Sequence, residues 1–178
     1  ITTADYFTVF DSAGKAVFRP TVHYAYHPCD DAVLSVREFQ MKNFEMQPKT
    51  RALNAEIVEG IDELGALLMG DFGAIWYGSQ LSIHEARELL GKRFNATSIQ
   101  IAAPVLAGAM WLIKNPDKGL LEPEDLDHEF VLEVCKPYLG AVVAEWSEWT
   151  PLRDRSVLFQ ESGLDWTDSW QFQNFRVT

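Results

Sequence analysis

The longest apolar run of the chain, Ile99–Ile113, is the feature that most constrains its fold. It lies within Ala96–Lys114, a segment rich in small residues, where we predict a buried helix because Asn95 is a good N-cap and an Asn-Pro pair follows the segment. Gln100 and Pro104 interrupt the run, and it is too short to span a bilayer. Folding at a length of 178 residues buries roughly 70% of the unfolded chain's surface, so one domain with a sizeable core is expected.

Strand-like and helix-like patterns surround this helix. Stretches of β-branched and aromatic residues, separated by turn residues, predict strands over Tyr6–Phe10, Ala16–Tyr26, Arg51–Glu59, Leu64–Met69, Ala74–Tyr77 and Gly140–Trp149. Helical spacing and caps predict helices over Ala32–Phe39, Ser82–Leu90 and Glu122–Tyr138, the second with a capping box from Ser82 to Glu85. Helices and strands do not alternate regularly, so we predict an α/β (α+β-like) fold with helices mainly on one face of a mixed β-sheet.

The charge balance restricts the partners. Asp and Glu total 26 against 15 Lys and Arg, giving a net charge of −11. A nucleic-acid binder needs a basic surface, and an anionic membrane would repel this chain, so neither partner is expected. An acidic cleft would attract a cationic small molecule, although surplus acid is also common in soluble proteins without such a ligand.

The cysteines and the first residues favour a cytoplasmic protein. Cys29 and Cys135 form no disulfide framework, and Cys135 is expected in the core. The opening residues lack the basic start and apolar centre of a signal peptide. They also lack an initiator Met and suggest a strand, so we interpret the chain as part of a longer protein. The irregular tail should dock through its aromatic residues Trp166, Trp170, Phe172 and Phe175.

The segment Pro20–Asp31 carries the first candidate site. His27 is expected at a strand end, just before a helix whose first turn holds Asp30 and a second aspartate, and a histidine there can transfer protons near neutral pH. The alternative is structural, with His27 bonded to the backbone and Asp30 capping the helix. A metal site at this segment is a weaker interpretation because no second ligand cluster occurs elsewhere. Cys29 is a poor nucleophile because adjacent carboxylates disfavour its thiolate.

The acidic run Glu56–Glu63 is the second candidate site. Its carboxylates Asp62 and Glu63 would suit the ammonium groups of a diamine, and Trp76 or Tyr77 could add a cation–π contact. The alternative is a solvated edge of the sheet. No GxGxxG, GxxxxGK[ST] or GxSxG motif occurs in the sequence, so the chain carries no phosphate or dinucleotide fingerprint of its own.

Several segments resemble one family. PTVHYAYHPCDDAVLS closely resembles the bacterial homospermidine synthases, and the same resemblance continues in order through EIVEGIDELGALLMG, WYGSQLS, NATSIQIAAPVLAGAMWLI and DSWQFQNFRV. NPDKGLLEPEDL is also similar to the wider saccharopine dehydrogenase-like family, in which such a run belongs to the second, substrate-bearing domain. The resemblance covers nearly the whole chain and implies a single substrate-binding and dimerisation domain over residues 1–178, the C-terminal part of a longer enzyme.

The resemblance implies an NAD-dependent transferase of polyamine biosynthesis that makes homospermidine from putrescine, acting as a homodimer. NAD oxidises one diamine to an imine, ammonia leaves, a second diamine condenses as a Schiff base, and the retained hydride reduces it. The Rossmann half expected to bind most of NAD is absent here, so the chain alone should be inactive. The candidate residues are His27 for proton transfer; Asp30, Asp62, Glu63, Trp76 and Tyr77 for substrate; and Asn95 and Ser98 for the cofactor or a substrate amine; no metal is expected.

Two other functions remain open at this point. One is a saccharopine-type amine or amino-acid dehydrogenase, which would change the net amount of NADH, whereas a synthase recycles its hydride. The other is a dimerisation module without catalytic activity.

Overall fold

The computed structural model describes residues 2–50, 53, 55–158 and 160–176, and it divides the chain into two compact units, Ile1–Leu53 and Asn54–Thr178. The expectation of a single domain over the whole chain stays a prediction.

The first unit begins with a short helix and a small hairpin. Its elements are α1 (Thr2–Tyr6), β1 (Val9–Phe10), β2 (Ala16–Phe18) and α2 (Asp30–Met41). The predicted hairpin is confirmed, and its turn is held by Asp11, whose carboxylate accepts hydrogen bonds from the backbone N–H groups of Ala13 and Lys15 at 2.9 Å each. The opening residues are helical, so the prediction of a strand from Tyr6 is wrong there.

The second strand of this hairpin is shorter than predicted. It ends at Phe18, and residues 19–29 form neither helix nor strand. Pro20 lacks the backbone N–H that a residue in a sheet donates to the neighbouring strand. The strand therefore does not continue to Tyr26, although the segment after Pro20 is rich in Val and Tyr. The predicted helix that follows is confirmed as α2, with Asp30 in its first turn and Cys29 at the N-cap without a side-chain capping bond.

The second unit is built on a three-stranded antiparallel sheet in the order β3–β4–β5. The strands are β3 (Ile61–Gly70), β4 (Gly73–Ser82) and β5 (Ala141–Ser147). The predicted strands around the Gly70–Gly73 turn are confirmed and extend further at both ends, whereas β5 ends before Trp149. The α/β prediction is confirmed, and the sheet is antiparallel rather than mixed.

The strand predicted over Arg51–Glu59 is wrong for the residues that the structure describes. Residue 53 and residues 55–59 form no strand, while Arg51, Ala52 and Asn54 lie outside the described residues. Gly60 has a φ of +140°, a backbone conformation that L side chains rarely adopt, and the regular pairing begins immediately after it. The acidic run therefore starts in a loop and enters the sheet only at its last two carboxylates.

The helix α3 (Ile83–Leu90) confirms its predicted cap. The Ser82 hydroxyl accepts a hydrogen bond from the Glu85 backbone N–H at 3.2 Å, and the Glu85 carboxylate accepts one from the Ser82 backbone N–H at 2.9 Å. These bonds satisfy helix donors that would otherwise lack partners, and the bonds from Ser82 lower the pKa of the Glu85 carboxyl.

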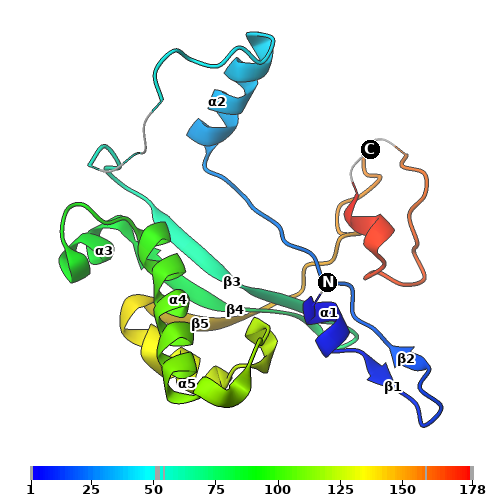
Figure 1. The fold of residues 1–178 in the computed structure, drawn as a ribbon. Coiled ribbons are helices and arrows are strands. Elements are labelled where there is room, and N and C mark those ends of the chain that lie inside the picture. The colour runs from blue at the N-terminus through cyan, green and yellow to red at the C-terminus, as the bar shows by residue number, and fades with distance from the viewer. Residues whose placement is uncertain (1, 51–52, 54, 159, 177–178) are drawn as a thin grey trace. The chain divides into compact units, whose positions relative to one another are not determined.

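The helix α4 (Ala96–Lys114) has the predicted bounds and the predicted cap, with Asn95 Oδ1 accepting from the Ser98 backbone N–H at 2.8 Å. It lies across one face of the sheet, with α3 and α5 on the same side (Figure 1). The residues that it buries share one side of the helix: Ala96, Ile99, Gln100, Ala103, Ala107 and Trp111. These contacts account for its apolar inner face.

The outer face of α4 is also apolar, so the prediction of a buried helix is confirmed only for its inner face. Ile101, Val105 and Ile113 recur at i, i+4 and i+12, and they are 57%, 69% and 79% exposed. Among the described residues, α4 is the one helix whose length and composition would allow a membrane span, with 28% of that window buried. The core helix of a soluble protein can have the same length and composition. The packing of α4 on the sheet accounts for the apolar residues of its inner face.

The predicted helix Glu122–Tyr138 is divided into three pieces. A 3₁₀ turn covers Pro123–Asp125, α5 covers His128–Cys135, and a second 3₁₀ turn covers Lys136–Tyr138. Asp127 starts α5 by accepting from two backbone N–H groups, and a proline in the second turn ends it. Cys135 is buried against α4 as predicted, and burial raises the pKa of its thiol.

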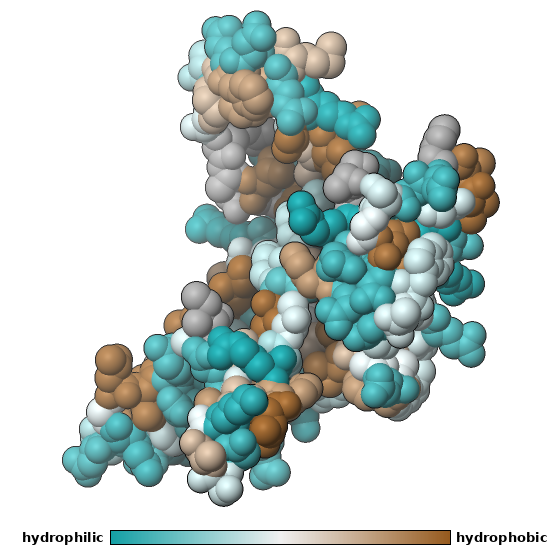
Figure 2. Space-filling view, turned by 90° about the vertical axis from the view of Figure 1, so that its right-hand side faces the viewer, coloured by the Kyte–Doolittle hydropathy of each residue, from teal (hydrophilic) through white to brown (hydrophobic). Residues whose placement is uncertain are grey.

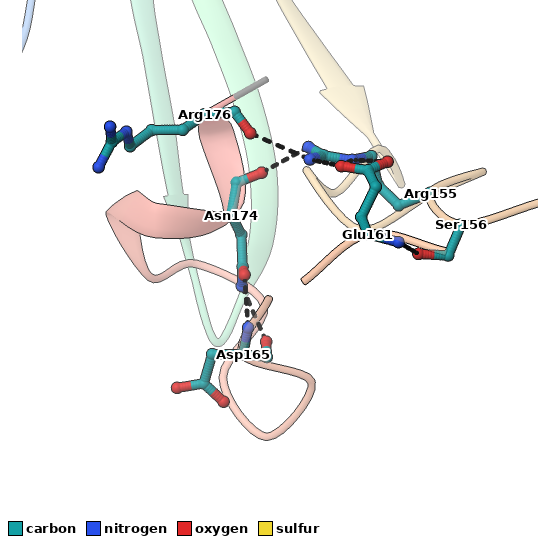
Figure 3. A network of polar contacts seen from close by, with 6 residues as sticks. All are labelled: Arg155, Ser156, Glu161, Asp165, Asn174 and Arg176. Atoms are coloured by element: carbon teal, nitrogen blue, oxygen red, sulfur yellow. Dashed lines mark hydrogen bonds and ion pairs between the residues drawn. The ribbon is translucent and has the colours of Figure 1, made fainter. Parts of the chain in front are cut away.

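The tail after β5 is organised by polar contacts more than by its aromatic residues. The Arg155 guanidinium forms a bidentate ion pair with Glu161 and donates to the backbone carbonyls of Asn174 and Arg176 at 2.9 and 3.0 Å (Figure 3). Asn174 is fully buried, and its amide bonds to the backbone of Asp165 in both directions.

The aromatic docking predicted for the tail is therefore confirmed only in part. Phe175 and Trp170 are half-buried, and the Phe175 ring lies 6.1 Å from that of Trp149. Trp166 and Phe172 are exposed.

Candidate functional site

The register of β3 and β4 sorts the predicted substrate residues onto the two faces of the sheet. Asp62 pairs with Leu81 and Tyr77 pairs with Ala66, on the face that the helices cover. Glu63 follows Asp62 in β3, so its side chain lies on the opposite face. Trp76 is likewise on the face opposite to Tyr77. The acidic pair is thus divided, and only Glu63 shares a face with the indole.

The face of Glu63 and Trp76 has a flat centre bordered by acidic side chains. Glycines 65 and 78 pair directly across the two strands, and the Trp76 indole lies over them, since a Cβ on Gly78 would stand 2.5 Å from Trp76 Cζ2. Glu145 of β5 pairs with Trp76 on its other side. Glu63 accepts a hydrogen bond of 2.6 Å from Gln80 Nε2. This face offers an aromatic surface and two carboxylates to a cation.

The helix-covered face holds a polar group that sequence reasoning missed. Gln100 of α4 donates from Nε2 to Ser79 Oγ at 2.9 Å and to the Asp62 backbone carbonyl at 3.3 Å. Gln100 and Ser79 are buried, at 2% and 4% exposure. The available signal was a lone amide within an apolar helix, which is costly to bury unless it is hydrogen-bonded.

His27 and Asp30 belong to the first unit, and neither residue is part of a strand. His27 is exposed in the irregular segment before α2, so the prediction that it lies at a strand end is wrong, while its place just before a helix is confirmed. Asp30 is the exposed first residue of α2. Both side chains are accessible to a substrate, and their roles stay predictions.

Asn95 and Ser98, the candidates for the cofactor, are the two ends of the α4 cap. The side-chain oxygen of Asn95 is occupied by this hydrogen bond, whereas the Ser98 hydroxyl is exposed. The described residues include no parallel strands joined by a glycine-rich turn, which is how dinucleotide phosphates are usually held. Residues 2–50, 53, 55–158 and 160–176 also include no group of three or more metal-binding His, Cys, Asp or Glu side chains.

Comparison with known proteins identifies the class. Residues 1–147 match the family model of the saccharopine dehydrogenase C-terminal domain, and the chain belongs to this family. The sequence-based resemblance is therefore confirmed on this point. The match covers the first unit and the second unit as far as the end of β5, Ser147.

Its similarity to particular proteins is closer still. The chain is 51% identical to the homospermidine synthase of Blastochloris viridis and 48% identical to that of Mesorhizobium japonicum, each over 99% of this chain. A crystal structure of homospermidine synthase from Legionella pneumophila in complex with NAD has a TM-score of 0.87 and 45% identity over 97% of the chain. The chain spans 36–37% of the length of these proteins.

Proposed function

We propose that this chain is the C-terminal part of a cytoplasmic, NAD-dependent homospermidine synthase, which converts two molecules of putrescine into homospermidine and ammonia. The observation that carries the proposal is the identity of about half of all positions to two homospermidine synthases across 99% of the chain. The solved relative is in complex with NAD, which supports NAD as the cofactor.

NAD would accept a hydride from the first diamine and return it to the Schiff base, so the reaction has no net redox change. The chain's described residues offer no phosphate cradle, which fits a cofactor bound mainly by an N-terminal half. The C-terminal part formed by this chain would then bind the ammonium groups of the substrates and transfer protons. Amine attack and ammonia loss both require proton transfer, and an imidazole near neutral pH suits that task.

His27 is the proposed proton-transfer residue. Its imidazole is exposed and it precedes α2 in a segment without regular structure, where a substrate can approach it. Asp30, three residues further along, is exposed at the start of α2 and could hold an ammonium group nearby.

Glu63 and Trp76 are the proposed ammonium-binding residues of the second unit. They share the face of the sheet away from α4, and the indole presents a flat surface between strands. A carboxylate and an aromatic face both attract an alkylammonium cation. Asp62 and Tyr77 lie on the other face and are less suited to the same substrate molecule.

We also propose that the enzyme is a homodimer, as the resemblance implies. Large apolar side chains reach the surface among polar ones on the face in Figure 2. The exposed apolar residues of the chain include the outer row of α4, Ile101, Val105 and Ile113. Exposed apolar patches of this kind mark interfaces. Val105→Glu in the whole enzyme should convert a dimer to monomers; an intact dimer of lowered stability would assign this row to contacts within one subunit.

The decisive experiment uses the whole enzyme, of the relatives' length, with putrescine and NAD. Homospermidine and ammonia should form in equal amounts while the absorbance of NADH at steady state stays constant. Net accumulation of NADH would instead support a saccharopine-type dehydrogenase. Absence of any product from a folded, NAD-bound enzyme would favour a module without this activity.

A further inference from the structure

Three elements meet at a buried polar group between α4 and the sheet. Ser79 points to the helix-covered face, because Gln100 of α4 donates to its hydroxyl at 2.9 Å. Ser79 pairs with Leu64, and Asp62 lies two residues from Leu64 in the same strand, so the Asp62 side chain is on this face too. Gln100 also donates to the Asp62 backbone carbonyl at 3.3 Å. One carboxylate, one amide and one hydroxyl are thus gathered under the helix.

This group has more hydrogen-bond acceptors than donors. Both amide hydrogens of Gln100 are used, one on Ser79 and one on the backbone of Asp62. Gln100 Oε1 and Asp62 Oδ2 are buried and accept no hydrogen bond from the residues that the structure describes. Each of these oxygens can only accept, since the Asp62 carboxylate carries no proton when ionised. Two buried acceptors without a donor destabilise the fold unless something supplies one.

Turning the Gln100 amide over does not repair this imbalance. The reversed amide would place Oε1 at the position of Nε2, 3.3 Å from the Asp62 backbone carbonyl oxygen, so that two acceptors would face each other. The orientation with Nε2 toward Ser79 and Asp62 is therefore the one that the neighbouring atoms favour. It leaves the buried Gln100 carbonyl oxygen without a donor among the described residues.

We propose that Asp62 Oδ2 and Gln100 Oε1 bind a monovalent cation of the size of ammonium or potassium. A water molecule could satisfy the two acceptors, but it would leave the carboxylate charge uncompensated, and Asp62 makes no ion pair with a described residue. A single carboxylate with neutral oxygens suits a singly charged ion, because calcium sites usually gather several carboxylates among six to eight oxygen ligands. The described residues contain no cluster of three or more acidic or metal-binding side chains here.

The cation would act as a link between α4 and β3. Gln100 reaches the sheet from the helix and Asp62 belongs to the strand, so an ion shared by the two side chains joins the two elements. The ion would stabilise the second unit by mass action, to an extent set by its concentration relative to its dissociation constant. This inference goes beyond the proposed function and does not depend on it.

The first test measures thermal unfolding of the whole enzyme, without substrate, in chloride salts at one ionic strength. Potassium or ammonium should raise the unfolding midpoint by about 2–4 °C over tetramethylammonium, with saturation. Gln100→Met and Asp62→Asn should each abolish this difference, whereas Asp71→Asn, in the exposed turn between β3 and β4, should keep it. Equal midpoints in all three salts for the wild type would overturn the proposal.

The second test needs no variant and therefore does not depend on whether the variants fold. Crystals of the whole enzyme soaked in thallium(I) should show an anomalous scattering peak between Asp62 and Gln100. Competition between ammonium and potassium for that peak would identify the preferred ion. An ordered water without anomalous signal at this position would overturn the proposal, even if the enzyme makes homospermidine as proposed.

Discussion

The Trp76 indole occupies the space that a side chain at Gly78 would need, since a Cβ there would lie 2.5 Å from Trp76 Cζ2 and 2.5 Å from the Leu64 carbonyl oxygen. The Leu64 carbonyl belongs to β3, so a shift of this carbonyl away from the new Cβ would disturb the pairing of β3 with β4. Gly78→Ala should therefore destabilise the protein by about 1–3 kcal/mol through overpacking. Chemical denaturation of the whole enzyme measures this difference.

Gly108→Ala is the matched control for that substitution. Gly108 lies inside α4, where a new Cβ would meet only Leu126 Cδ1 at 3.8 Å. Alanine is favoured over glycine in a helix by about 0.5–1 kcal/mol, so this variant should be neutral or more stable. Equal destabilisation by both variants would contradict the proposed position of the indole.

Local signals in the sequence predicted the helices better than the strands. Asn95 and the Ser82–Glu85 capping box act within one turn of chain, and both helix starts are confirmed. The stretch Ala16–Tyr26 has strand composition but forms no strand beyond Phe18, because strand formation depends on pairing with residues distant in sequence.

A correct prediction of the candidate site requires the register of β3 and β4, and the sequence alone does not reveal that register. Asp62 and Glu63 look like one acidic pair, yet pairing with β4 places them on opposite faces. Gln100 was visible as a polar residue in an apolar run, but its partners come from two strands. The contact of Arg155 with the Asn174 backbone joins residues 19 positions apart and has no local signal.

The Arg155–Glu161 ion pair should make the tail sensitive to acid. The hydrogen bonds from Arg155 lower the pKa of the Glu161 carboxyl, so this glutamate binds a proton less readily in the folded tail than in the unfolded chain. Its contribution to stability is present above the ordinary glutamate pKa of about 4.3 and is lost as the pH falls through the lowered value.

Hydrogen exchange of the Asn174 backbone N–H, followed from pH 6 to pH 3 and corrected for intrinsic rates, checks this prediction. Protection should fall in the acidic part of that range in the wild type. Glu161→Gln should show reduced protection already at pH 6 and a weaker pH dependence. The capping box of α3 is an internal reference for the variant: the pKa of Glu85 is also lowered, so protection of the Glu85 backbone N–H should have the same pH dependence in the wild type and in Glu161→Gln. A pH dependence unchanged by Glu161→Gln would mean that another group controls the tail.

His27→Ala in the whole enzyme should lower the turnover number by roughly 10²-fold, the low end of contributions from general acid–base catalysis. Its stability should change little because His27 is exposed. His84, exposed on α3, supplies the control His84→Ala, which should keep full activity. Wild-type turnover in a well-folded His27→Ala enzyme would exclude the proposed role.

Glu63→Gln should raise the Michaelis constant for putrescine with a smaller effect on the turnover number. The substitution removes a negative charge beside Trp76 while leaving an amide oxygen that can still accept from Gln80. Added salt should weaken putrescine binding in the wild type, because exposed charges are screened. Asp71→Asn, in the exposed turn between β3 and β4, is the control that removes an equal charge elsewhere on the sheet. Equal Michaelis constants for Glu63→Gln and wild type would remove Glu63 from the substrate site.

Residues 1–178 alone should bind NAD weakly or not at all and make no homospermidine. The sheets in the described residues are antiparallel, and no glycine-rich turn leads from a parallel strand into a helix to receive a pyrophosphate. The apolar outer row of α4 should also make the isolated chain self-associate. Calorimetric titration with NAD, a product assay and sedimentation measure the three properties, with the whole enzyme as the positive control. Tight NAD binding with product formation by the isolated chain would place the cofactor within these residues, and a strictly monomeric species would contradict the role proposed for the α4 surface.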